Sequence, residues 1–584
     1  MSKKIIKFII DGNEVEVKEG ETILDGARKL GIDIPTLCFL KEINEVGACR
    51  MCLVEVEGAR GLVTSCVHPA TEGMIVKTNT PEVNKSRKMT LELLLSNHNK
   101  KCLTCVRNTN CELQNLSKRF GLEDIRFTGE KTKVVIDESS KCIERDTSKC
   151  ILCGRCVSIC SNVQTVSALT RVQRGFNTYV GIAEDMEIAQ STCVGCGQCV
   201  VNCPTGALKE KDVISEVVET INDPEKIVIV QTAPSIRAAL GEEFGLPVGT
   251  LVEGQMVTAL KRAGFNKVFD TDFAADVTIM EEGAEFLKRL EKNENIPMIT
   301  SCSSGWITFA EKFFPDLLAH LSTTKSPMSI MGTLIKTDYA KRKKIDPSKI
   351  YSVAIMPCSA KKAEIVRPEL EIEGRRVIDA VLTTRELGRM LKQLNIDIAV
   401  LPDSKFDNPL GEATGAGHIF GVTGGVMEAA LRTINKKLTG KTINDIAFET
   451  LRGEQGIKEA KINVAGKELN IAVAQGLGNC RKLLEEIAEG KSKYHFIEVM
   501  TCPGGCIMGG GQPIKSPYEL ARLNVPKLRA KAIYKADEKS RYRISCDNES
   551  VKKLYDEFLG EPNSKKSHEL LHTSYNKQEV YVKK

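Results

Sequence analysis

Two copies of one cysteine spacing lie near the middle of the chain, and this spacing is typical of proteins that hold iron-sulfur clusters. Each copy reads C-x2-C-x2-C-x3-C, and Pro204 follows the second copy. The cysteines are Cys150, Cys153, Cys156, Cys160, Cys193, Cys196, Cys199 and Cys203. Thiolates at these separations can ligate clusters from short loops. The repeat therefore predicts two 4Fe-4S clusters and one-electron chemistry.

The two copies are expected to exchange their last cysteines. In the bacterial two-cluster ferredoxin pattern, the fourth cysteine of each run ligates the other cluster. One predicted ligand set is therefore Cys150, Cys153, Cys156 and Cys203, and the other is Cys193, Cys196, Cys199 and Cys160. The internal repeat supports a pseudo-twofold ferredoxin-like module over residues 138–212.

Two further ligand sets precede this module. The first, C-x10-C-x2-C-x13-C, suits a 2Fe-2S centre and consists of Cys38, Cys49, Cys52 and Cys66. The second, H-x3-C-x2-C-x5-C, predicts a 4Fe-4S cluster with one histidine ligand and consists of His98, Cys102, Cys105 and Cys111. Structural zinc is the alternative at both places, because zinc also takes four thiolate or imidazole ligands. The remaining Cys142, Cys480 and Cys546 fit no pattern and are expected to be buried thiols.

A glycine-rich stretch near the C-terminus, EVMTCPGGCIMGGGQP over residues 498–513, contains two cysteines four residues apart, Cys502 and Cys506. Both can face one metal centre. Glycines let the main chain approach such a centre and aim N–H groups at it, and here they are Gly504, Gly505, Gly509, Gly510 and Gly511. A glycine-rich turn with two incidental thiols is the alternative.

Composition limits the class of protein. The 584 residues predict three to five domains, with 42% hydrophobic residues. We expect a cytoplasmic protein, since the first residues lack a signal-peptide core and no long apolar run suggests a membrane span. Twenty-two cysteines then indicate metal ligation or redox chemistry. The formal charge of +6 omits deprotonated ligands, and the scattered lysines do not suggest nucleic acid binding.

Hydrophobic patterns predict the elements that position these ligands. Residues 3–17 should form a β-hairpin that turns at Asp11-Gly12-Asn13, and a helix should follow over 22–30. This order resembles the β-grasp fold of plant-type ferredoxins, while the cysteine spacing is closer to that of the electron-input subunit of respiratory complex I. Residues 88–97 should form a second helix. The polar, lysine-rich segment from about Pro562 is expected to be a solvated tail.

From about residue 220 the pattern changes to α/β. Buried strands are expected at 226–231, 351–356 and around 471–474, with amphipathic helices between them. No GxGxxG or Walker loop is present, so a nucleotide site is not expected. Three loops follow strand-like segments, at 300–306, 356–364 and the glycine-rich stretch. Such loops are where α/β folds place cofactors.

Together these loops, TSCSSGW, MPCSAKKAE and EVMTCPGGCIMGGGQP, resemble the signature segments of the FeFe hydrogenases. The resemblance covers essentially the whole chain, including the upstream cysteine sets of the large monomeric clostridial and NAD-linked members. It implies a multidomain α+β and α/β fold. The domains would be a β-grasp 2Fe-2S domain (1–80), a small 4Fe-4S domain with one histidine and three cysteine ligands (81–125), a two-cluster ferredoxin-like domain (138–212), a two-lobed α/β H-cluster domain (220–515) and a C-terminal helical small-subunit-like segment with a tail (516–584).

The resemblance also implies an H-cluster, in which a 4Fe-4S cubane is bridged to a diiron unit that carries CO, cyanide and an azadithiolate. By position, Cys358, Cys502 and Cys506 would ligate the cubane, and Cys506 would also bridge to the diiron unit. Lys361 would hydrogen-bond a cyanide. Met356 and Met500 would pack against the diiron unit, and Gly504, Gly505 and Gly510 would line the cofactor.

The first loop departs from the family pattern. The family usually has two adjacent cysteines followed by proline, whereas Ser303 and Ser304 follow Cys302 here. By position, Cys302 is the proton relay and Ser303 stands at the fourth cubane ligand. A serine alkoxide is a harder and poorer ligand for iron than a thiolate. Three outcomes remain open: Ser303 ligates, Cys302 shifts to ligate, or the cubane lacks a fourth protein ligand.

A proton route is also expected. Glu282, Glu285 and Arg289 share one face of a helix-like run, which is either a solvated charged face or a proton wire. With the resemblance, the outside-to-inside order would be Arg289, Glu285, Ser322, Glu282 and Cys302.

The implied reaction is the reversible reduction of protons to H2, with electrons from ferredoxin and with H-cluster maturation proteins as further partners. One alternative is the catalytic subunit of an electron-bifurcating complex with flavin and NAD(P) subunits. Another is a hydrogenase-like sensor or electron-transfer protein without turnover. A hydrogenase of this kind would hold about twenty irons per chain, in one 2Fe-2S cluster, three 4Fe-4S clusters and the H-cluster.

Overall fold

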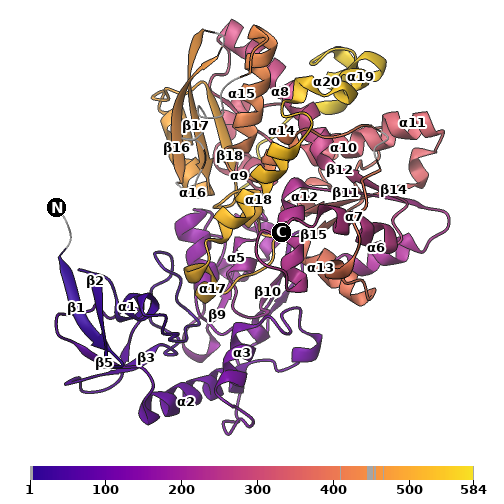
Figure 1. Cartoon of the computed structure of the whole chain (residues 1–584). Helices are drawn as coiled ribbons and strands as arrows, with labels where there is room; N and C mark the ends of the chain where they lie inside the picture. Colours follow the sequence, from indigo (N-terminus) through magenta and orange to yellow (C-terminus); the bar gives the residue numbers. More distant parts are fainter. Residues whose placement is uncertain (1–3, 408–409, 443–451, 453–455, 465, 583–584) are drawn as a thin grey trace.

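A computed structural model describes residues 4–407, 410–442, 452, 456–464 and 466–582. Figure 1 shows α/β lobes at one end of the molecule and the N-terminal domains at the other, with the middle of the chain between them. The expected multidomain α+β and α/β fold is confirmed by the order of its sheets. Among the described residues, no helix has the length and apolarity needed to cross a membrane.

The N-terminal domain is a five-stranded sheet in the order β2-β1-β5-β3-β4 with one helix, α1 (Ile23–Lys29), beside it. The strands are β1 (Ile5–Ile10), β2 (Asn13–Lys18), β3 (Leu53–Val56), β4 (Val63–Thr64) and β5 (Ile75–Lys77). The predicted hairpin pairs Ile10 with Asn13, so the loop is Asp11-Gly12, and both residues have the positive φ that a tight hairpin turn requires. Thr22 caps α1 through a capping box with Asp25.

The next domain is helical. The helix predicted over 88–97 is longer at its N-terminus, because Thr80 caps it and Pro81 occupies the first turn, which gives α2 (Pro81–Asn97). It ends directly before His98. A 3-10 turn, η1 (Cys102–Thr104), and α3 (Glu112–Arg119) complete the domain. The cysteines therefore lie on the loops between two helices.

The two-cluster region is built around a three-stranded antiparallel sheet, β10-β7-β6, and a two-stranded ribbon, β8-β9. The strands are β6 (Ile136–Asp137), β7 (Ile143–Asp146), β8 (Thr170–Val172), β9 (Tyr179–Gly181) and β10 (Leu208–Glu210). Short helices, α4 (Arg155–Ser158) and α5 (Gln198–Val201), begin inside the two cysteine runs. Gly154 and Gly197 precede them in the left-handed conformation, which a side chain there would disfavour.

The large domain contains two sheets, as the two-lobed prediction requires. In the first, β12-β11-β14-β15, all neighbours are parallel, and α6 (Ile214–Ile221), α7 (Glu253–Arg262) and α13 (Thr384–Gln393) pack around it. Its strands are β11 (Ile227–Thr232), β12 (Lys267–Asp270), β14 (Ile350–Met356) and β15 (Ala380–Thr383). These strands are buried and rich in Val and Ile, as is typical of parallel sheets covered on both faces.

The second sheet has the order β13-β18-β17-β16, with only β16 antiparallel to its neighbour. Its strands are β13 (Met298–Ile299), β16 (Ile457–Val464), β17 (Lys467–Gln475) and β18 (Phe496–Met500). The long helix α8 (Thr271–Lys292) contacts both α10 (Pro327–Leu334) and α15 (Gly425–Thr439). The loops after β13, β14 and β18 are the three loops that the sequence singled out.

The C-terminal segment corrects one expectation, because the residues after Pro562 are not a solvated tail. Helices α17 (Pro517–Arg522), α18 (Val525–Lys539) and α19 (Glu549–Leu554) lead to α20 (Lys565–Leu571). Leu571 is fully buried, and Ser567 and His572 bond to the buried carboxylate of Glu281 in α8. The sequence around Leu571 is mostly polar, so this buried contact was not predicted. The segment then runs on to Val582, whose N–H donates to Gln190 O at 3.0 Å.

Candidate metal centres and active site

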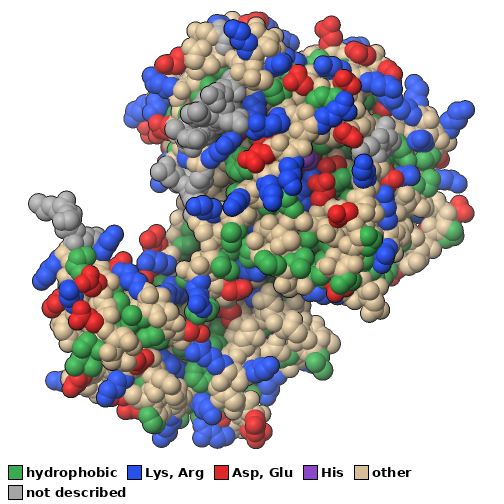
Figure 2. All heavy atoms as spheres, viewed as in Figure 1, with side chains coloured by type: hydrophobic (Ala, Val, Ile, Leu, Met, Phe, Trp, Pro, Cys, Tyr) green, Lys and Arg blue, Asp and Glu red, His purple; other side chains and the backbone are tan. Residues whose placement is uncertain are grey.

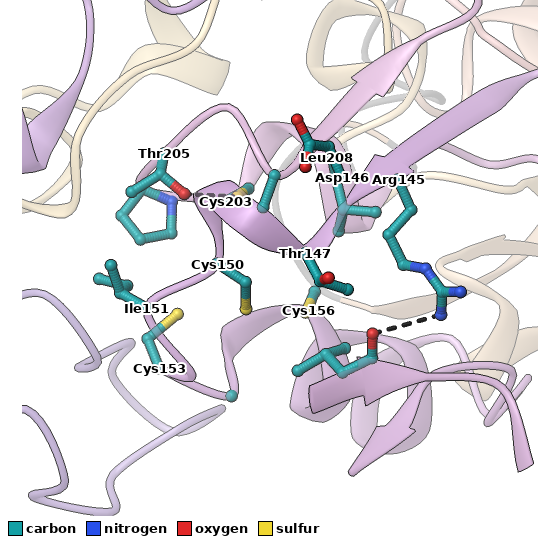
Figure 3. Close-up of a pocket in the computed structure, with 14 residues that line it drawn as sticks. Arg145, Asp146, Thr147, Cys150, Ile151, Cys153, Cys156, Cys203, Thr205 and Leu208 are labelled. Carbon is teal, nitrogen blue, oxygen red and sulfur yellow. Dashed lines mark hydrogen bonds between the residues drawn. The ribbon is translucent and has the colours of Figure 1, made fainter. Parts of the chain in front are cut away.

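The paired cysteine runs line two separate cavities. One cavity is lined by Cys150, Cys153, Cys156 and Cys203, and Figure 3 shows these sulfurs with the side chains of Thr205 and Leu208. The other is lined by Cys160, Cys193, Cys196 and Cys199. Each cavity thus combines three cysteines of one run with the fourth of the other. This is the exchanged arrangement that the repeat predicts, and its walls are otherwise largely apolar, as suits a buried cluster.

The first ligand set is gathered in two close pairs within the N-terminal domain. The Sγ atoms of Cys52 and Cys66 are 3.2 Å apart, and Cys38 and Cys49 are also in hydrogen-bond contact. The bond from Cys38 lowers the pKa of the Cys49 thiol. All four therefore come from neighbouring loops of one small domain, although 27 residues lie between the first and the last.

The His98 set lies between the N-terminal domain and the two-cluster module. His98 is 8% exposed, and its Nδ1 has no hydrogen-bond partner in the described part of the chain. Burial lowers the pKa of this imidazole to about 4, so it stays neutral, which is the form that binds metal. Cys111 Sγ lies 3.6 Å from Pro204 O, and Cys105 Sγ lies against Gly206. This site therefore directly adjoins the segment that follows Cys203.

Three cysteines converge between the two lobes of the large domain. Cys358 follows β14, while Cys502 and Cys506 follow β18, the latter opening η16 (Cys506–Met508). Burial raises the pKa of the Cys506 thiol to about 12, and burial together with Cys358 also raises the pKa of Cys502. Three neutral thiols would gain little from being placed together without a metal, whereas a cationic iron centre favours their thiolates. The donor set fits a 4Fe-4S cubane.

The glycines of the 498–513 stretch have a more specific structural role than the sequence indicated. A Cβ on Gly510 would lie 2.2 Å from Cys196 O, and one on Gly509 would lie 2.2 Å from Pro357 O. Gly504 and Gly505 have φ of +86° and +78°. The glycines thus let the loop pack backbone to backbone against the Cys196 run and the Cys358 loop, which brings the cysteines of three segments together.

Two hydroxyl groups that the sequence analysis did not single out also face this region. Ser235 Oγ and Thr423 Oγ1 are buried and have no hydrogen-bond partner among the described residues. A Cβ on Gly421 would lie 3.3 Å from the Ser235 backbone, and one on Gly505 would lie 2.8 Å from Thr423 N. Unpaired buried hydroxyls beside Cys506 fit a polar cofactor. In the sequence, the signal that could have identified Ser235 was its position three residues after β11, because α/β folds place ligands at the ends of their strands.

Lys361 and the two predicted methionines occupy the same region. Lys361 Nζ donates to Cys302 O at 3.1 Å and to Glu364 Oε2 at 2.7 Å. The Glu364 carboxylate also accepts from Ser304, Ser326 and Ser329, so its position is fixed. Met356 and Met500 are buried at the ends of β14 and β18, and Met500 belongs to the same apolar cluster as Cys506.

The structure gives Ser303 a set of local partners. Its Oγ lies 2.7 Å from Thr501 Oγ1 and accepts the N–H of Thr501 at 3.2 Å. The hydroxyl therefore ties the 300–306 loop to the residue before Cys502. Cys302, one residue earlier, lies near Glu282 and Cys506, and burial raises the pKa of its thiol.

Hydrogen bonds join three of the predicted proton-route residues, and the other two lie beside them. Arg289 Nη2 donates to Glu285 Oε1 at 2.6 Å, and Ser322 Oγ donates to Glu285 Oε2 at 2.8 Å. Ser322 also lies close enough to Glu282 to lower the pKa of that carboxyl. Burial raises the pKa of Glu282 to about 8, so this carboxyl can hold or release a proton near neutrality. The face of α8 that carries Glu282 and Glu285 is therefore buried and is not a solvated charged face.

The second cluster cavity contacts the active-site loops directly. Ser359 Oγ donates to Gly195 O at 2.7 Å, and Gln198 Nε2 donates to Met508 O at 3.3 Å. Cys142, which fitted no ligand pattern, is buried against Gly195, and Cys480 is buried as well, while Cys546 is half-buried. The loop that contains Cys196 is thus in direct contact with the loop that contains Cys502.

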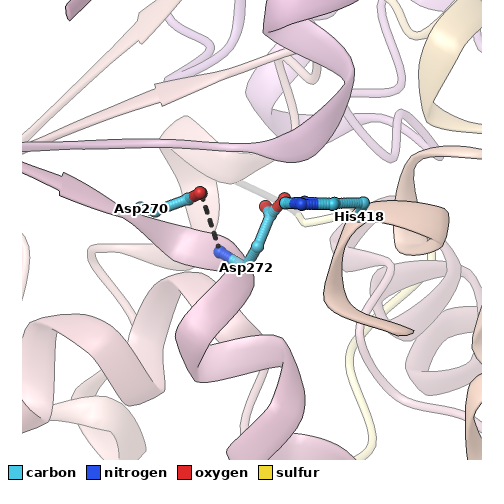
Figure 4. Close-up of side chains that lie close together, drawn as sticks. All are labelled: Asp270, Asp272 and His418. Atoms are coloured by element: carbon cyan, nitrogen blue, oxygen red, sulfur yellow. Dashed lines mark hydrogen bonds and ion pairs between the residues drawn. The ribbon is translucent and has the colours of Figure 1, made fainter. Parts of the chain in front are cut away.

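In one other group of potential metal ligands, the negative charges already have an arginine as their partner. Asp270, Asp272 and His418 converge at the N-terminus of α8, as Figure 4 shows. Arg237 Nη2 lies 2.8 Å from Asp270 Oδ1 and 3.0 Å from Asp272 Oδ2. The guanidinium occupies the place of a cation, so this group is a buried ion-pair network.

Family models match most of the chain. The model for the iron only hydrogenase large subunit, C-terminal domain, matches residues 226–510, and the iron hydrogenase small subunit matches 524–578. A 2Fe-2S iron-sulfur cluster binding domain matches 3–81. The NADH-ubiquinone oxidoreductase-G iron-sulfur binding region matches 87–126, and a 4Fe-4S dicluster domain matches 149–207.

Relatives match over nearly full length. The NADP-reducing hydrogenase subunit HndD of Solidesulfovibrio fructosivorans is 49% identical over 98% of this chain and 99% of its own. Iron hydrogenase 1 of Clostridium pasteurianum is 42% identical over 98% of this chain and 100% of its own. The solved apo [FeFe]-hydrogenase HydA1 of Chlamydomonas reinhardtii is 39% identical, with a TM-score of 0.56 over 63% of this chain and 99% of that one.

Proposed function

The chain belongs to the iron-only (FeFe) hydrogenase family, and from that premise we propose how its residues divide the reaction among separate routes for electrons and protons. As a hydrogenase it catalyses the reversible reduction of protons to H2, with electrons carried by iron-sulfur clusters. Its cofactors are 2Fe-2S and 4Fe-4S clusters and the H-cluster. When bound, the H-cluster supplies the redox and Lewis-acid chemistry, while the chain positions it and exchanges protons with it.

We propose that the domains and ligand sets are those expected from the sequence, with about twenty irons per chain. The two cavities of the ferredoxin-like module hold one 4Fe-4S cluster each, and the Cys38 and His98 sets hold the 2Fe-2S cluster and a further 4Fe-4S cluster. Cys358, Cys502 and Cys506 hold the H-cluster, beside Lys361 and the two methionines. Electrons then pass from the N-terminal domains through the Cys196 loop to Cys502.

Protons take the opposite side of the active site. Arg289 holds Glu285 at the outer end, Ser322 bridges the two carboxyl groups, and Glu282 passes the proton to Cys302. The hydrogen bonds that join Arg289, Glu285 and Ser322, with the buried Glu282 beside Ser322, are the single observation that carries this proposal. A structural ion pair at Glu285 would not require a second buried carboxyl with a raised pKa.

For the redox partner we propose ferredoxin, acting on a cytoplasmic enzyme that maturation proteins load with its H-cluster. A second candidate is the catalytic subunit of an NAD(P)-linked complex with flavin subunits. The relative named NADP-reducing hydrogenase subunit, which spans the whole chain, favours it. Purification of the natively tagged protein would decide between them, since a stoichiometric flavoprotein would support the second candidate.

The test of the function uses protein matured anaerobically with its H-cluster. We expect infrared bands from CO and cyanide that change under H2, together with H2 evolution from reduced methyl viologen. Zinc sites and plain ferredoxin clusters give no bands in that region. Bands without turnover would contradict catalysis and support the hydrogenase-like sensor, while absent bands in matured protein would contradict the H-cluster assignment.

A further inference from the structure

A buried histidine of the C-terminal segment connects two glutamates that lie one turn apart on α8. His572 is 6% exposed, and both of its ring nitrogens have partners. Nε2 lies 3.1 Å from Glu281 Oε2, and Nδ1 lies 2.7 Å from Thr323 Oγ1. The N–H of Thr323 donates to both carboxylate oxygens of Glu285, at 3.2 and 3.1 Å. His572 and Thr323 therefore join Glu281 to Glu285, the outer carboxyl of the proposed proton route.

The two partners of His572 depend on it to different degrees. Three other groups donate to the Glu281 carboxylate, namely the Tyr555 hydroxyl at 2.6 Å, the Asn563 N–H at 2.7 Å and the Ser567 hydroxyl at 3.2 Å. Glu281 is therefore held in place without the histidine. In the described part of the chain, the hydroxyl of Thr323 bonds only to His572. Loss of the imidazole would therefore release Thr323 and leave Glu281 fixed.

Hydrogen-bond chemistry sets the direction of these two bonds. A carboxylate accepts, so His572 Nε2 donates to Glu281. The Nδ1 atom of a neutral ring then accepts the proton of the Thr323 hydroxyl. His568, one turn earlier in α20, is exposed and stacks its ring on His572, with the ring centroids 4.5 Å apart. Glu281 and the stacked ring thus fix the orientation of the imidazole.

The backbone of the C-terminal segment is attached to the same part of the large domain, the stretch 322–324. His572 forms an antiparallel β-bridge with this stretch, and Tyr575 Oη donates to Ser322 O at 2.8 Å. Ser322 is also the residue whose hydroxyl donates to Glu285 Oε2 at 2.8 Å. The C-terminal segment therefore holds both neighbouring residues that donate hydrogen bonds to the Glu285 carboxylate.

The location of these contacts favours a role in orientation. Figure 1 shows α19 and α20 beside α8 and α10, remote from the N-terminal domains. Figure 2 shows basic and acidic side chains interspersed on the surface at this end of the molecule. His572 and Glu281 are buried beneath that surface. They are therefore better placed to orient the proton route than to collect protons from water.

We propose that His572 is a positioning residue for proton transfer, which orients Thr323 so that the N–H of Thr323 holds the Glu285 carboxylate beside Ser322. The inference rests on the proposed function, because it assigns the residue that orders the outer end of the proposed proton route. His572 itself transfers no proton. Proton transfer requires donor and acceptor within hydrogen-bond reach, so a misplaced Glu285 carboxylate slows it.

The test separates the two ring nitrogens in the matured holoenzyme. His572→Gln places an amide near the position of Nε2, so it can keep the bond to Glu281 but loses the bond to Thr323. His572→Asn places an amide near the position of Nδ1, so it can keep the bond to Thr323. With saturating reduced methyl viologen, the rate of H2 evolution should fall about tenfold or more in His572→Gln and stay within about threefold of the parent in His572→Asn. The ratio of the rates in H2O and D2O should rise only in His572→Gln, because proton transfer then limits turnover.

A second variant and a matched control test the other end of the same bond. Thr323→Val removes the hydroxyl and keeps the backbone N–H, so it should reproduce both effects of His572→Gln. The control, Ser567→Ala, removes another donor to Glu281 from the same segment and leaves the bond between His572 and Thr323 intact. Amide hydrogen exchange of the holoenzymes, followed by mass spectrometry, gives a readout besides activity. Peptides that contain Thr323 should exchange faster in His572→Gln and Thr323→Val than in the parent and the control.

The outcomes separate this inference from the proposed function. A parent rate with a parent isotope effect in His572→Gln would overturn the positioning role, and so would an equal loss in His572→Asn or in Ser567→Ala. If His572→Gln does not fold with its clusters, Thr323→Val decides alone. A parent protein that evolves no H2 with viologen fails the proposed function itself, and a full rate in Glu282→Gln fails the proton route. A slow Glu282→Gln enzyme beside a full-rate His572→Gln enzyme fails only the positioning role.

Discussion

Ser303 Oγ and Thr501 Oγ1 lie 2.7 Å apart, and the N–H of Thr501 also donates to Ser303 at 3.2 Å. The serine that replaces the usual cubane ligand therefore already makes two hydrogen bonds, both with Thr501 on the Cys502 loop. This geometry favours the reading in which Ser303 is a neutral hydroxyl that joins two loops. A thiolate ligand at this position would instead have to point away from Thr501.

The substitution Ser303→Ala tests that reading. We expect the iron content to stay at the parent value, because the hydroxyl does not ligate. The loss of the two hydrogen bonds should lower the free energy of unfolding by about 1 to 3 kcal/mol. Iron analysis and thermal unfolding measure the two effects, with Thr501→Val as the control that removes the partner hydroxyl. Loss of iron in Ser303→Ala alone would assign Ser303 to the cubane.

The raised pKa of Glu282 predicts the pH dependence of catalysis. Burial raises that pKa from 4.5 to about 8, so the carboxyl is protonated below pH 8 and charged above it. The rate of H2 evolution should therefore decline as pH rises through about 8. The buried carboxyl also lowers the free energy of unfolding as pH rises from about 4.5 to about 8, since the unfolded chain ionises near pH 4.5 and the folded chain only near pH 8.

The substitution Glu282→Gln should remove this titration and slow turnover by about 100-fold or more, as is usual for a lost proton carrier. Rates of H2 evolution with saturating methyl viologen, measured from acidic to alkaline pH, would show both changes. Glu291→Gln makes the same change at an exposed position of the same helix and should keep the parent profile. A full rate in Glu282→Gln would contradict the proton route.

His98 gives a prediction about cluster potential. Its neutral, buried imidazole has an Nδ1 with no hydrogen-bond partner among the described residues, which fits a metal ligand. His98→Cys should keep the iron content and move the midpoint potential of that cluster to a more negative value, because a thiolate adds one negative charge. His98→Ala should lose about four irons. Redox titrations followed by electron paramagnetic resonance would report both, and an unchanged spectrum in His98→Ala would assign the histidine to the protein core.

The outcome at particular residues shows what sequence could predict. The exchanged cysteine sets, the Asp11-Gly12 hairpin and the order of the domains follow local spacing and turn chemistry, and the fold confirms the last two. The buried C-terminus was missed, because the partner of Ser567 and His572 is Glu281, which lies far earlier in the chain. Ser235 and Thr423 were missed for the same reason: a hydroxyl becomes notable only when burial leaves it unpaired.

Gly510 supplies a prediction about the joint between the electron chain and the active site. A Cβ there would meet Cys196 O at 2.2 Å and Gly197 Cα at 2.8 Å, and both are backbone atoms that cannot rotate away. Arg385 also binds Gly510 O at 2.8 Å and pairs with Glu210 at 2.7 Å, so the loop cannot shift easily. The added methyl must therefore separate the Cys196 run from the Cys502 loop.

We accordingly expect Gly510→Ala to lower stability by about 1 to 3 kcal/mol and to slow electron transfer into the H-cluster more than it slows proton transfer. Turnover driven by ferredoxin should fall, while the pH profile set by Glu282 keeps its shape. Gly490→Ala is the control for glycine substitution, because a Cβ there meets no atom within 4 Å, although its φ of +67° adds local strain. A Gly510→Ala enzyme with parent turnover would show that the two loops do not need this close contact.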